Sequence, residues 1–483
     1  MDSAHATNAS NPDELTATFS RLQHAARREP MPGPDERIAR LDALAAMIRG
    51  YQQDIIEAIS ADFGHRAAYE TKLLEWMPLL DEIAHIRRHL RGWMKPRRIS
   101  ANWTFWPSTA GLHPQPLGVV GVIGAWNYPL QLTLSPAANA LAAGNRVMLK
   151  PSEHAPRTAA LLQRVIAENF APEVFSVVTG DAEVSAAFSA LPFDHLLFTG
   201  STRVGRKVMQ AAAEKLTPVT LELGGKSPAI IQADFPLAEA ADRIASAKFW
   251  NAGQTCIAPD YVLLPKARVE EFTTLLTQAI ERRWPLESRD RDYTSMIDAK
   301  AHARMQMLVD DVSAKGARIM QAWPGDRSDT DGGHRVFPPT VIADATVDMQ
   351  VMDEEIFGPL LPLVGYDTLE DALDFVRARD RPLALYYFDH DATRIRHMLD
   401  TTHAGGVTLN DCMFHFAQHR LPFGGIGASG MGVYHGEAGF NRFSHMKPVL
   451  RQSGLTAKVL GRLIRPPYGR QTDRLIRLLA GRK

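Results

Sequence analysis

Cysteine is scarce in this chain, with two among 483 residues. Two cysteines can form at most one disulfide, so a disulfide-stapled scaffold is excluded and a reducing compartment fits better. Charge is balanced, with 54 basic and 54 acidic side chains, so composition gives no reason to expect a nucleic-acid partner. Residues 1–20 lack an apolar stretch behind a basic start, and the longest apolar run, LGVVGVIGAW at 117–126, is too short to cross a bilayer. These absences predict a cytoplasmic protein without a membrane span.

The length of the chain and two changes in its pattern predict more than one domain. Residues 1–100 read as helices, beginning with Asn11 as a cap before a proline and two acidic residues. From Leu117 onward, short apolar runs alternate with helical stretches, which predicts parallel sheets covered by helices on both faces. Between them, residues 101–116 are expected to form an exposed strand or arm, whose aromatic residues would be buried best against another subunit.

The last 33 residues, 451–483, carry nine Arg or Lys and one acidic residue. Two short amphipathic stretches, LTAKVLGRLI and DRLIRLLAG, flank a Pro-Pro break. Because each stretch makes only a few helical turns, its apolar face is expected to pack on the protein or on a partner subunit. Attachment to a membrane surface is the alternative.

One of the two cysteines, Cys256, lies in the segment FWNAGQTCIAP. A free cysteine is more often a small buried hydrophobe than a thiolate nucleophile, and this segment alone leaves both interpretations open. The other cysteine, Cys412 in LNDCMFHF, has no context typical of a nucleophile and is expected to be structural.

Two polar residues follow apolar strands of the predicted sheets. Glu222, in TLELGGKSP, ends one strand, and the carboxyl ends of parallel strands are where such sheets bind ligands; a solvated strand end or a salt bridge explains it equally well. Asn127, in GAWNYPL, could donate its amide N–H to a developing oxyanion, as could the backbone N–H of Cys256. Asn before Tyr-Pro is also ordinary turn chemistry, so both interpretations stay open.

Two further segments have features of a dinucleotide site. FTGSTRVGRKVM supplies a glycine-rich turn between a strand and a helix, with Gly200, Ser201 and Gly205. Free N–H groups at the start of that helix favour a pyrophosphate, although the spacing departs from G-x-G-x-x-G. VMLKPSE ends another strand with Lys150 and Glu153, which suit ribose hydroxyls or are ordinary strand-end charges.

Two histidine pairs, His85 with His89 and His415 with His419, have the i, i+4 spacing of a metal pair. No third ligand of suitable spacing is evident, so we predict no metal site. Residues 414–416, Phe-His-Phe, are expected either to line a substrate entrance or to pack in the core.

Seven motifs in order resemble those of the aldehyde dehydrogenase superfamily, from about residue 110 to residue 445. They are PLGVVGVIGAWNYP, LKPSE, FTGSTRVG, LELGGKSP, GQTCIAP, EEIFGPLLP and LPFGGIGASGMG. Within the superfamily, the ending GMGVYHGEAGFNRFSHMKPV resembles the dimeric class-3 branch. The segment CMFHFAQHRLPFGGIGASGMGVYHG and the tail RPPYGRQTDRLIRLLAG are similar to those of bacterial coniferyl aldehyde dehydrogenases.

The resemblance implies an α/β fold with a Rossmann-like parallel-sheet cofactor domain, an α/β catalytic domain and a small bridging β arm. It divides the chain into an NAD-binding domain (1–100 and 117–225), a catalytic domain (226–415), a bridging or oligomerisation arm (101–116 and 416–450) and a basic helical tail (451–483). The family's variant of the dinucleotide fold also explains the missing glycine fingerprint.

The resemblance implies a cysteine-dependent mechanism. Cys256 would attack the aldehyde carbon to give a thiohemiacetal, whose oxygen Asn127 and the Cys256 N–H would hold. Loss of hydride to the nicotinamide would leave a thioester, and Glu222 would activate the water that hydrolyses it.

The resemblance also assigns the cofactor contacts. Lys150 and Glu153 would contact the adenine ribose, and the turn of Gly200, Ser201 and Gly205 would approach the pyrophosphate. The nicotinamide ribose and ring would be positioned by Glu355 and Phe357, in EEIFGP. Glu153 favours NAD, because a 2′-phosphate would face a carboxylate, although NADP use is possible.

The predicted function is therefore NAD(P)-dependent oxidation of an aldehyde, with coniferyl aldehyde to ferulate as the first choice. A fatty or medium-to-long aliphatic aldehyde is the alternative. A CoA-acylating reductase is disfavoured because such enzymes typically lack the glutamate found at position 222, and a non-catalytic descendant is improbable because every catalytic-motif residue is present. The resemblance to the class-3 branch implies a homodimer.

Overall fold

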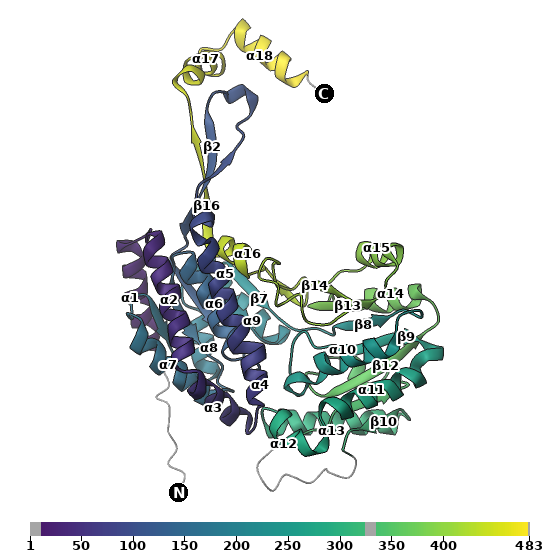
Figure 1. Ribbon diagram of the computed structural model, residues 1–483. Helices are drawn as coiled ribbons and strands as arrows, with labels where there is room; N and C mark the ends of the chain where they lie inside the picture. The colour runs from purple at the N-terminus through teal and green to yellow at the C-terminus, as the bar shows by residue number, and fades with distance from the viewer. Residues whose placement is uncertain (1–10, 324–334, 482–483) are drawn as a thin grey trace.

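The computed structural model describes residues 11–323 and 335–481, and it begins with a layer of helices (Figure 1). The Asn11 side chain caps the first helix by accepting a hydrogen bond from the N–H of Glu14 at 2.8 Å, as its position before the proline predicts. A π-helical turn, η1, interrupts the layer between two α-helices. The layer consists of α1 (Pro12–Arg28), α2 (Pro34–Gly50), α3 (Gln52–Phe63), α4 (Ala68–Thr71), η1 (Lys72–Trp76) and α5 (Met77–Trp93).

The first sheet has six strands in the order β15-β7-β6-β3-β4-β5, all parallel except the short edge strand β15. Its central strands are buried on both faces, as expected for a parallel sheet between helix layers. Apolar residues of α1 pack on one face, and those of α2, α5, α6 and α7 pack on the other. The strands are β3 (Val119–Ile123), β4 (Arg146–Lys150), β5 (Phe175–Val177), β6 (His195–Thr199), β7 (Val219–Glu222) and β15 (Gly430–Met431). The helices between them are α6 (Gln131–Ala142), α7 (Pro156–Asn169), α8 (Ala182–Ser189) and α9 (Thr202–Ala213).

The second sheet has seven strands in the order β10-β11-β12-β9-β8-β13-β14, with only β10 antiparallel. Its strands are β8 (Pro228–Ile231), β9 (Tyr261–Pro265), β10 (Arg318–Gln321), β11 (Thr340–Ala343), β12 (Leu360–Tyr366), β13 (Ala384–Phe388) and β14 (Gly406–Leu409). Its longer helices are α10 (Leu237–Phe249), α11 (Val269–Arg283), α13 (Ala299–Ala314), α14 (Leu369–Arg377) and α15 (Ala392–Thr401). The alternation of strands and helices seen in the sequence thus forms two separate sheets.

A narrow arm extends from the body of the molecule (Figure 1). It is a three-stranded antiparallel sheet of β1 (Arg97–Ile99), β2 (Thr109–Pro116) and β16 (Ser444–Arg451). The strand predicted within 101–116 begins only at Thr109, because a 3₁₀ turn, η2 (Trp103–Phe105), precedes it. Within the predicted arm range 416–450, only β16 joins this sheet. The earlier residues pack against the body, where β15 pairs with β7.

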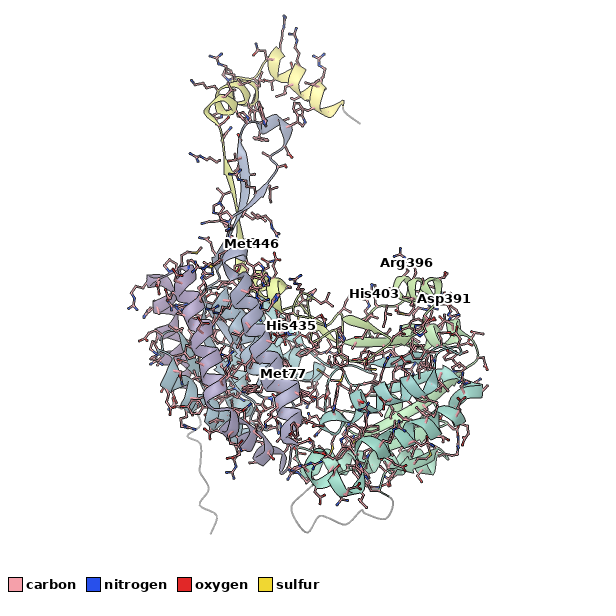
Figure 2. The ribbon with its side chains drawn as sticks, viewed as in Figure 1. Met77, Asp391, Arg396, His403, His435 and Met446 are labelled. Atoms are coloured by element: carbon pink, nitrogen blue, oxygen red, sulfur yellow. The ribbon has the colours of Figure 1, made fainter. Side chains whose placement is uncertain are left out.

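The basic tail forms two helices at the far end of the arm, α17 (Gly454–Ile464) and α18 (Arg470–Ala480). The Thr456 hydroxyl lies within hydrogen-bonding distance of the carbonyls of Phe105 and Trp106, at 3.1 and 3.2 Å, and so joins α17 to the arm tip. Figure 2 shows the side chains of the arm above Met446 projecting to both sides of the narrow sheet. Within residues 11–323 and 335–481, no helix combines the length and the apolar character needed to span a bilayer.

Candidate active site

Cys256 lies in a loop between the two sheets, after the short turn η3 (Trp250–Gly253) and before β9. Its side chain is partly exposed and forms no disulfide, whereas Thr255 and Ile257 beside it are buried. Burial raises the pKa of the Cys256 thiol, and the nearby carboxyls of Glu355 and Glu222 raise it further. Backbone N–H groups of Cys256 and Ile257 act in the opposite direction by hydrogen bonding to the sulfur. In the cofactor-free protein, the thiol is therefore the main form at neutral pH.

Glu222 is the last residue of β7, at the carboxyl edge of the first sheet, and its side chain is buried. Neither carboxyl oxygen has a hydrogen-bond partner among the described residues. Burial raises the pKa of Glu222 well above its usual range, while Arg442 opposes that shift. Once ionised, a buried carboxylate of raised pKa close to a cysteine is a strengthened base that is able to accept a proton from water that enters the site.

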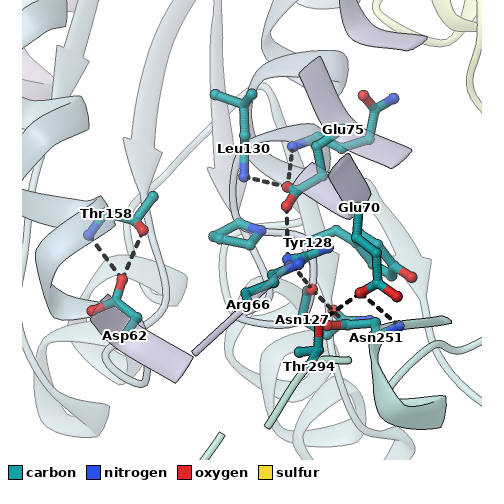
Figure 3. Close-up of polar contacts among 12 residues, drawn as sticks. Asp62, Arg66, Glu70, Glu75, Asn127, Tyr128, Leu130, Thr158, Asn251 and Thr294 are labelled. Carbon is teal, nitrogen blue, oxygen red and sulfur yellow. Dashed lines mark hydrogen bonds and ion pairs between the residues drawn. The ribbon is translucent and has the colours of Figure 1, made fainter. Parts of the chain in front are cut away.

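Asn127 lies in the loop after β3 and is buried against the cysteine loop. Its Nδ2 donates to the carbonyl of Gln254 at 3.1 Å, two residues before Cys256. Its own carbonyl accepts hydrogen bonds from Arg66 and from the Asn251 side chain, as Figure 3 shows. The two loops that carry Asn127 and Cys256 are thus joined by direct hydrogen bonds.

The predicted adenine-ribose pair forms at the end of β4. Lys150 Nζ donates to Glu153 Oε2 at 2.7 Å; the lysine side chain is buried and that of Glu153 is partly exposed. Burial alone would raise the pKa of Glu153, but the hydrogen bond and charge of Lys150 bring it below its usual value. Glu153 is therefore ionised at neutral pH and able to accept hydrogen bonds from hydroxyl groups.

The glycine-rich turn follows β6, two strands away in the same sheet. Ser201 caps α9, its hydroxyl accepting weakly from the N–H of Val204 at 3.4 Å, so Gly200 lies just outside the helix. Gly205 lies in the second turn of α9, where an added Cβ would come 2.6 Å from Leu223 Cδ2. Because Gly205 has no Cβ, α9 can lie close to Leu223, the residue that follows β7.

Glu355 and Phe357 lie in the loop between η6 (Gln350–Met352) and β12. Burial raises the pKa of Glu355 to about 8, and Asp260 adds to the shift. Glu355 Oε1 has no partner among the described residues, and an added Cβ at Gly224 would lie 1.9 Å from its Oε2. Phe357 adopts a left-handed backbone, φ 51°, and its ring packs edge-on against Trp126 at 5.4 Å between centroids.

These groups fit a bound dinucleotide. Lys150, Gly200 and Glu222 end or follow three parallel strands of one sheet, β4, β6 and β7, and this is the edge at which such sheets bind nucleotides. The start of α9 offers backbone N–H groups, and the buried Glu355 oxygen lacks an internal donor.

The structure adds residues that the sequence analysis did not single out. Arg66, Glu70 and Glu75, from the N-terminal helical layer, lie buried beside the Asn127 and Cys256 loops. Tyr434 is also buried nearby: burial raises the pKa of its phenol, and the charges of Glu222 and Cys256 contribute. No local pattern marks these residues, because charged residues in a helical stretch are usually solvated.

The remaining candidate residues are Cys412, the two histidine pairs and residues 414–416. Cys412 is buried in the core. Among the described residues, no three His, Cys, Asp or Glu side chains are grouped as a metal site. The rings of His85 and His89 pack at 4.3 Å between centroids, and His415 Nδ1 pairs with the Thr408 hydroxyl at 2.8 Å. Phe414 is exposed, whereas Phe416 packs edge-on against Phe423 in the core.

Known proteins match nearly the whole chain. The profile of the aldehyde dehydrogenase family matches residues 5–449. A probable coniferyl aldehyde dehydrogenase of Pseudomonas aeruginosa is 48% identical over 96% of each chain. The coniferyl aldehyde dehydrogenase of Pseudomonas sp. strain HR199 is 43% identical over 97% of this chain and 96% of its own. Rat aldehyde dehydrogenase family 3 member A2 is 39% identical over 89% of this chain and 87% of its own.

Solved structures also match more than nine tenths of the chain. The substrate-bound AldH of Staphylococcus aureus superposes with a TM-score of 0.90 at 33% identity, covering 96% of this chain and 99% of the other. An aldehyde dehydrogenase of Mycobacterium tuberculosis complexed with NAD+ gives a TM-score of 0.83 at 30% identity, covering 92% of each chain. These matches confirm the fold class predicted from the seven motifs.

Proposed function

The chain belongs to the aldehyde dehydrogenase family, and we propose that its substrate is an aromatic aldehyde, coniferyl aldehyde, which it oxidises to ferulate. The family confirms the predicted activity, NAD(P)-dependent oxidation of an aldehyde. One observation supports the choice of substrate: two relatives named for coniferyl aldehyde are 48% and 43% identical over nearly the full chain. A fatty or medium-to-long aliphatic aldehyde is the alternative.

In the proposed reaction, Cys256 is the nucleophile. Its sulfur loses its proton to solvent water and bonds to the aldehyde carbon, and the carbonyl electron pair moves onto oxygen. Asn127 Nδ2 and the backbone N–H of Cys256 donate to that oxyanion, where preorganised donors lower the barrier most. The thiohemiacetal forms on Cys256 and, after loss of hydride from its carbon, becomes a thioester. The nicotinamide cofactor, when bound, supplies the acceptor for that hydride.

Glu222 completes the proposed cycle. A thioester hydrolyses slowly without a base, so water must lose a proton as it attacks the acyl carbon. The Glu222 carboxylate takes that proton and passes it to the sulfur as the C–S bond breaks, so the acid leaves and the sulfur returns as a thiol. Its lack of internal hydrogen bonds supports this role, because no protein donor competes with the water.

We propose that seven residues hold the cofactor. The ionised Glu153 supports a preference for NAD, because a 2′-phosphate would meet a carboxylate there; NADP remains the second candidate. The proposed cofactor residues are Lys150, Glu153, Gly200, Ser201, Gly205, Glu355 and Phe357.

Initial rates of NAD and NADP reduction with cinnamyl, benzoic and aliphatic aldehydes test the proposal. We expect the highest kcat/KM for coniferyl aldehyde with NAD, and free acid as the product without CoA. A higher kcat/KM for long aliphatic aldehydes would favour the alternative substrate. A strict need for CoA would exclude the hydrolytic reaction.

We propose that the enzyme is a homodimer and that the arm is its contact surface. Trp103 and Trp106, at the tip of the arm, are 59% and 77% exposed, and Leu450, which pairs with Ala110 in the arm sheet, is 54% exposed. Sedimentation equilibrium should give twice the mass of the chain, 107 kDa for two 53.4-kDa copies. Trp106→Glu should shift the protein to monomer, and an unchanged dimer would exclude the arm tip as the interface.

The domain boundaries and the compartment also remain proposals. We divide the chain into the cofactor domain (1–100 and 117–225), the catalytic domain (226–415), the arm region (101–116 and 416–450, of which residues 416–443 pack against the body) and the tail (451–483). Two unpaired cysteines support a reducing compartment, the cytoplasm. Limited proteolysis and cell fractionation test these two points.

A further inference from the structure

Three charged side chains of the N-terminal helical layer are buried beside the loops of the proposed active site (Figure 3). Arg66 lies just before α4, Glu70 lies in α4, and Glu75 lies in the π-helical turn η1. A π-helical turn, with i→i+5 hydrogen bonds, contains one more residue than a turn of α-helix. Glu70 and Glu75 are five positions apart, and both carboxylates face inward. Burial of three charges is costly unless each makes specific contacts, so their partners indicate what they do.

Arg66 and Glu75 together hold the segment that carries Asn127. Arg66 Nη1 donates to Glu75 Oε1 at 2.8 Å and to the Asn127 carbonyl at 3.1 Å. Glu75 Oε2 accepts from the N–H groups of Leu130 and Gln131, at 2.8 and 3.1 Å, where α6 begins. The backbone from 127 to 131 is therefore held at both ends by one ion pair.

Glu70 holds the loop that precedes Cys256. Its Oε2 accepts from the Asn251 N–H at 3.0 Å and from the Thr294 hydroxyl at 2.6 Å. Asn251 and Ala252 both have left-handed backbones, φ 54° and 50°, which residues with a Cβ adopt only when their surroundings enforce it. The contact from Glu70 is made at the first residue of this strained turn.

Asn251 connects the two halves of the network. Its Nδ2 lies 3.0 Å from the Asn127 carbonyl and 3.1 Å from the Gln254 carbonyl. Asn127 Nδ2 donates to the same Gln254 carbonyl at 3.1 Å, which uses one of its two N–H groups. The second N–H of the Asn127 amide is available to another acceptor. The hydrogen bonds of the network fix the direction in which this N–H points.

We propose that Arg66, Glu70 and Glu75 are positioning residues that aim the Asn127 amide and the Cys256 loop at the substrate oxygen. The inference rests on the proposed role of Asn127 in holding the oxyanion. The three residues act through Asn127 and Asn251 and do not touch the substrate themselves. Because the bound aldehyde carries no oxyanion until the sulfur attacks it, their loss should slow acylation without weakening aldehyde binding in proportion.

The test uses Glu75→Gln and Arg66→Lys in the full-length protein, alone and combined with Asn127→Ala. Acylation of Cys256 by 4-nitrophenyl acetate, followed as nitrophenolate release without cofactor, isolates the oxyanion step. The NADH burst rate with NAD and aldehyde is the second measurement. We expect each single variant to slow both rates by about 10- to 100-fold, somewhat less than loss of a whole oxyanion donor.

The double variants separate positioning from general stability. If Glu75 acts through Asn127, Glu75→Gln should slow acylation by less than about threefold in the Asn127→Ala background. A full 10- to 100-fold loss in both backgrounds would overturn the inference. If a variant fails to fold, Thr294→Val is the milder replacement, because it removes one donor to Glu70. Thr294→Val should then show the same dependence on Asn127, and an equal loss in both backgrounds would again overturn the inference.

Arg37→Lys is the matched control. Arg37 is as buried as Arg66 and donates to the carbonyls of Ala142 and Ala143 at the opposite end of α6, at 3.3 and 2.7 Å. It should lower Tm like the test variants but leave both rates per folded molecule within about twofold. Equal slowing by Arg37→Lys would show that the effect follows stability, against the inference.

Two outcomes distinguish this inference from the proposed function. Normal acylation in Asn127→Ala would remove the oxyanion role and the positioning role together. Slow acylation in Asn127→Ala with normal rates in Glu75→Gln would leave the proposed mechanism intact and reject only the positioning by the N-terminal layer.

Discussion

Glu75 and Glu222 are two buried carboxyls with opposite surroundings. Both are almost inaccessible to solvent, 0% and 3% exposed, and burial raises the pKa of each. Glu75 is paired with Arg66 and accepts two backbone N–H groups, whereas Glu222 has no hydrogen-bond partner among the described residues. A buried polar group left unpaired costs about 1–3 kcal/mol. Glu75 therefore has the satisfied contacts of a scaffold residue, and the strand end has the unsatisfied ones expected of a reacting group.

We expect the largest effect from a change at the Cys256 sulfur, which lies near Glu222. Cys256→Ser should lower NADH formation by about 10⁴-fold or more, because a hydroxyl without a strong base is a far weaker nucleophile than a thiolate. The matched control is Cys412→Ser, which changes the other cysteine, buried in the core, and should keep near-normal turnover. Steady-state absorbance at 340 nm measures both. Normal turnover by Cys256→Ser would contradict the proposed mechanism.

Glu222→Gln should separate the two halves of the reaction. A glutamine cannot accept the proton of water, so the thioester should accumulate after one NADH per active site, and steady-state turnover should fall by about 10²- to 10⁴-fold. Stopped-flow measurement of the burst checks this. Loss of the burst itself would assign Glu222 to the acylation step instead.

The raised thiol pKa predicts a pH dependence for chemical labelling. Below its pKa the thiolate fraction grows tenfold per pH unit, so alkylation of Cys256 by iodoacetamide should speed up by about 10³-fold from pH 6 to pH 9 without cofactor. Mass spectrometry of the Cys412→Ser variant assigns the label to one sulfur. An alkylation rate that stops rising near pH 7 would mean that burial and the nearby carboxyls do not raise the pKa of this thiol.

Glu70 should show the smallest effect, on stability. Burial raises its folded-state pKa to about 7 from 4.5, so the folded protein holds a proton that the unfolded chain releases between these values. The free energy of unfolding, relative to Glu70→Gln, should therefore fall by about 2–3 kcal/mol from pH 5 to pH 8. Urea unfolding of both proteins at pH 5 and pH 8 measures this. If the difference in unfolding free energy between them does not vary with pH, the pKa of Glu70 is not raised.

Local chemistry explains which parts of the site were predictable. Cys256, Glu222, Asn127 and the glycine-rich turn each lie in a short motif whose residue types match one chemical task, and the order of these motifs indicated the family. The cap of α1 at Asn11 was also predictable, because it depends on neighbours within three residues. The supporting residues had no such signal, since Arg66 reaches Asn127 across 61 positions and Glu70 reaches Asn251 across 181.

The sequence by itself determined the alternation of strands and helices, the scarcity of disulfide chemistry and the motifs for a thiol, a base and a dinucleotide. Only the tertiary structure decided that residues 416–443 pack against the body, that Glu222 has no hydrogen-bond partner in the described part of the chain and that the N-terminal layer contacts the active-site loops. The reason is physical: periodicity and capping act between near neighbours, whereas burial, pKa shifts and strained turns depend on which distant segments meet.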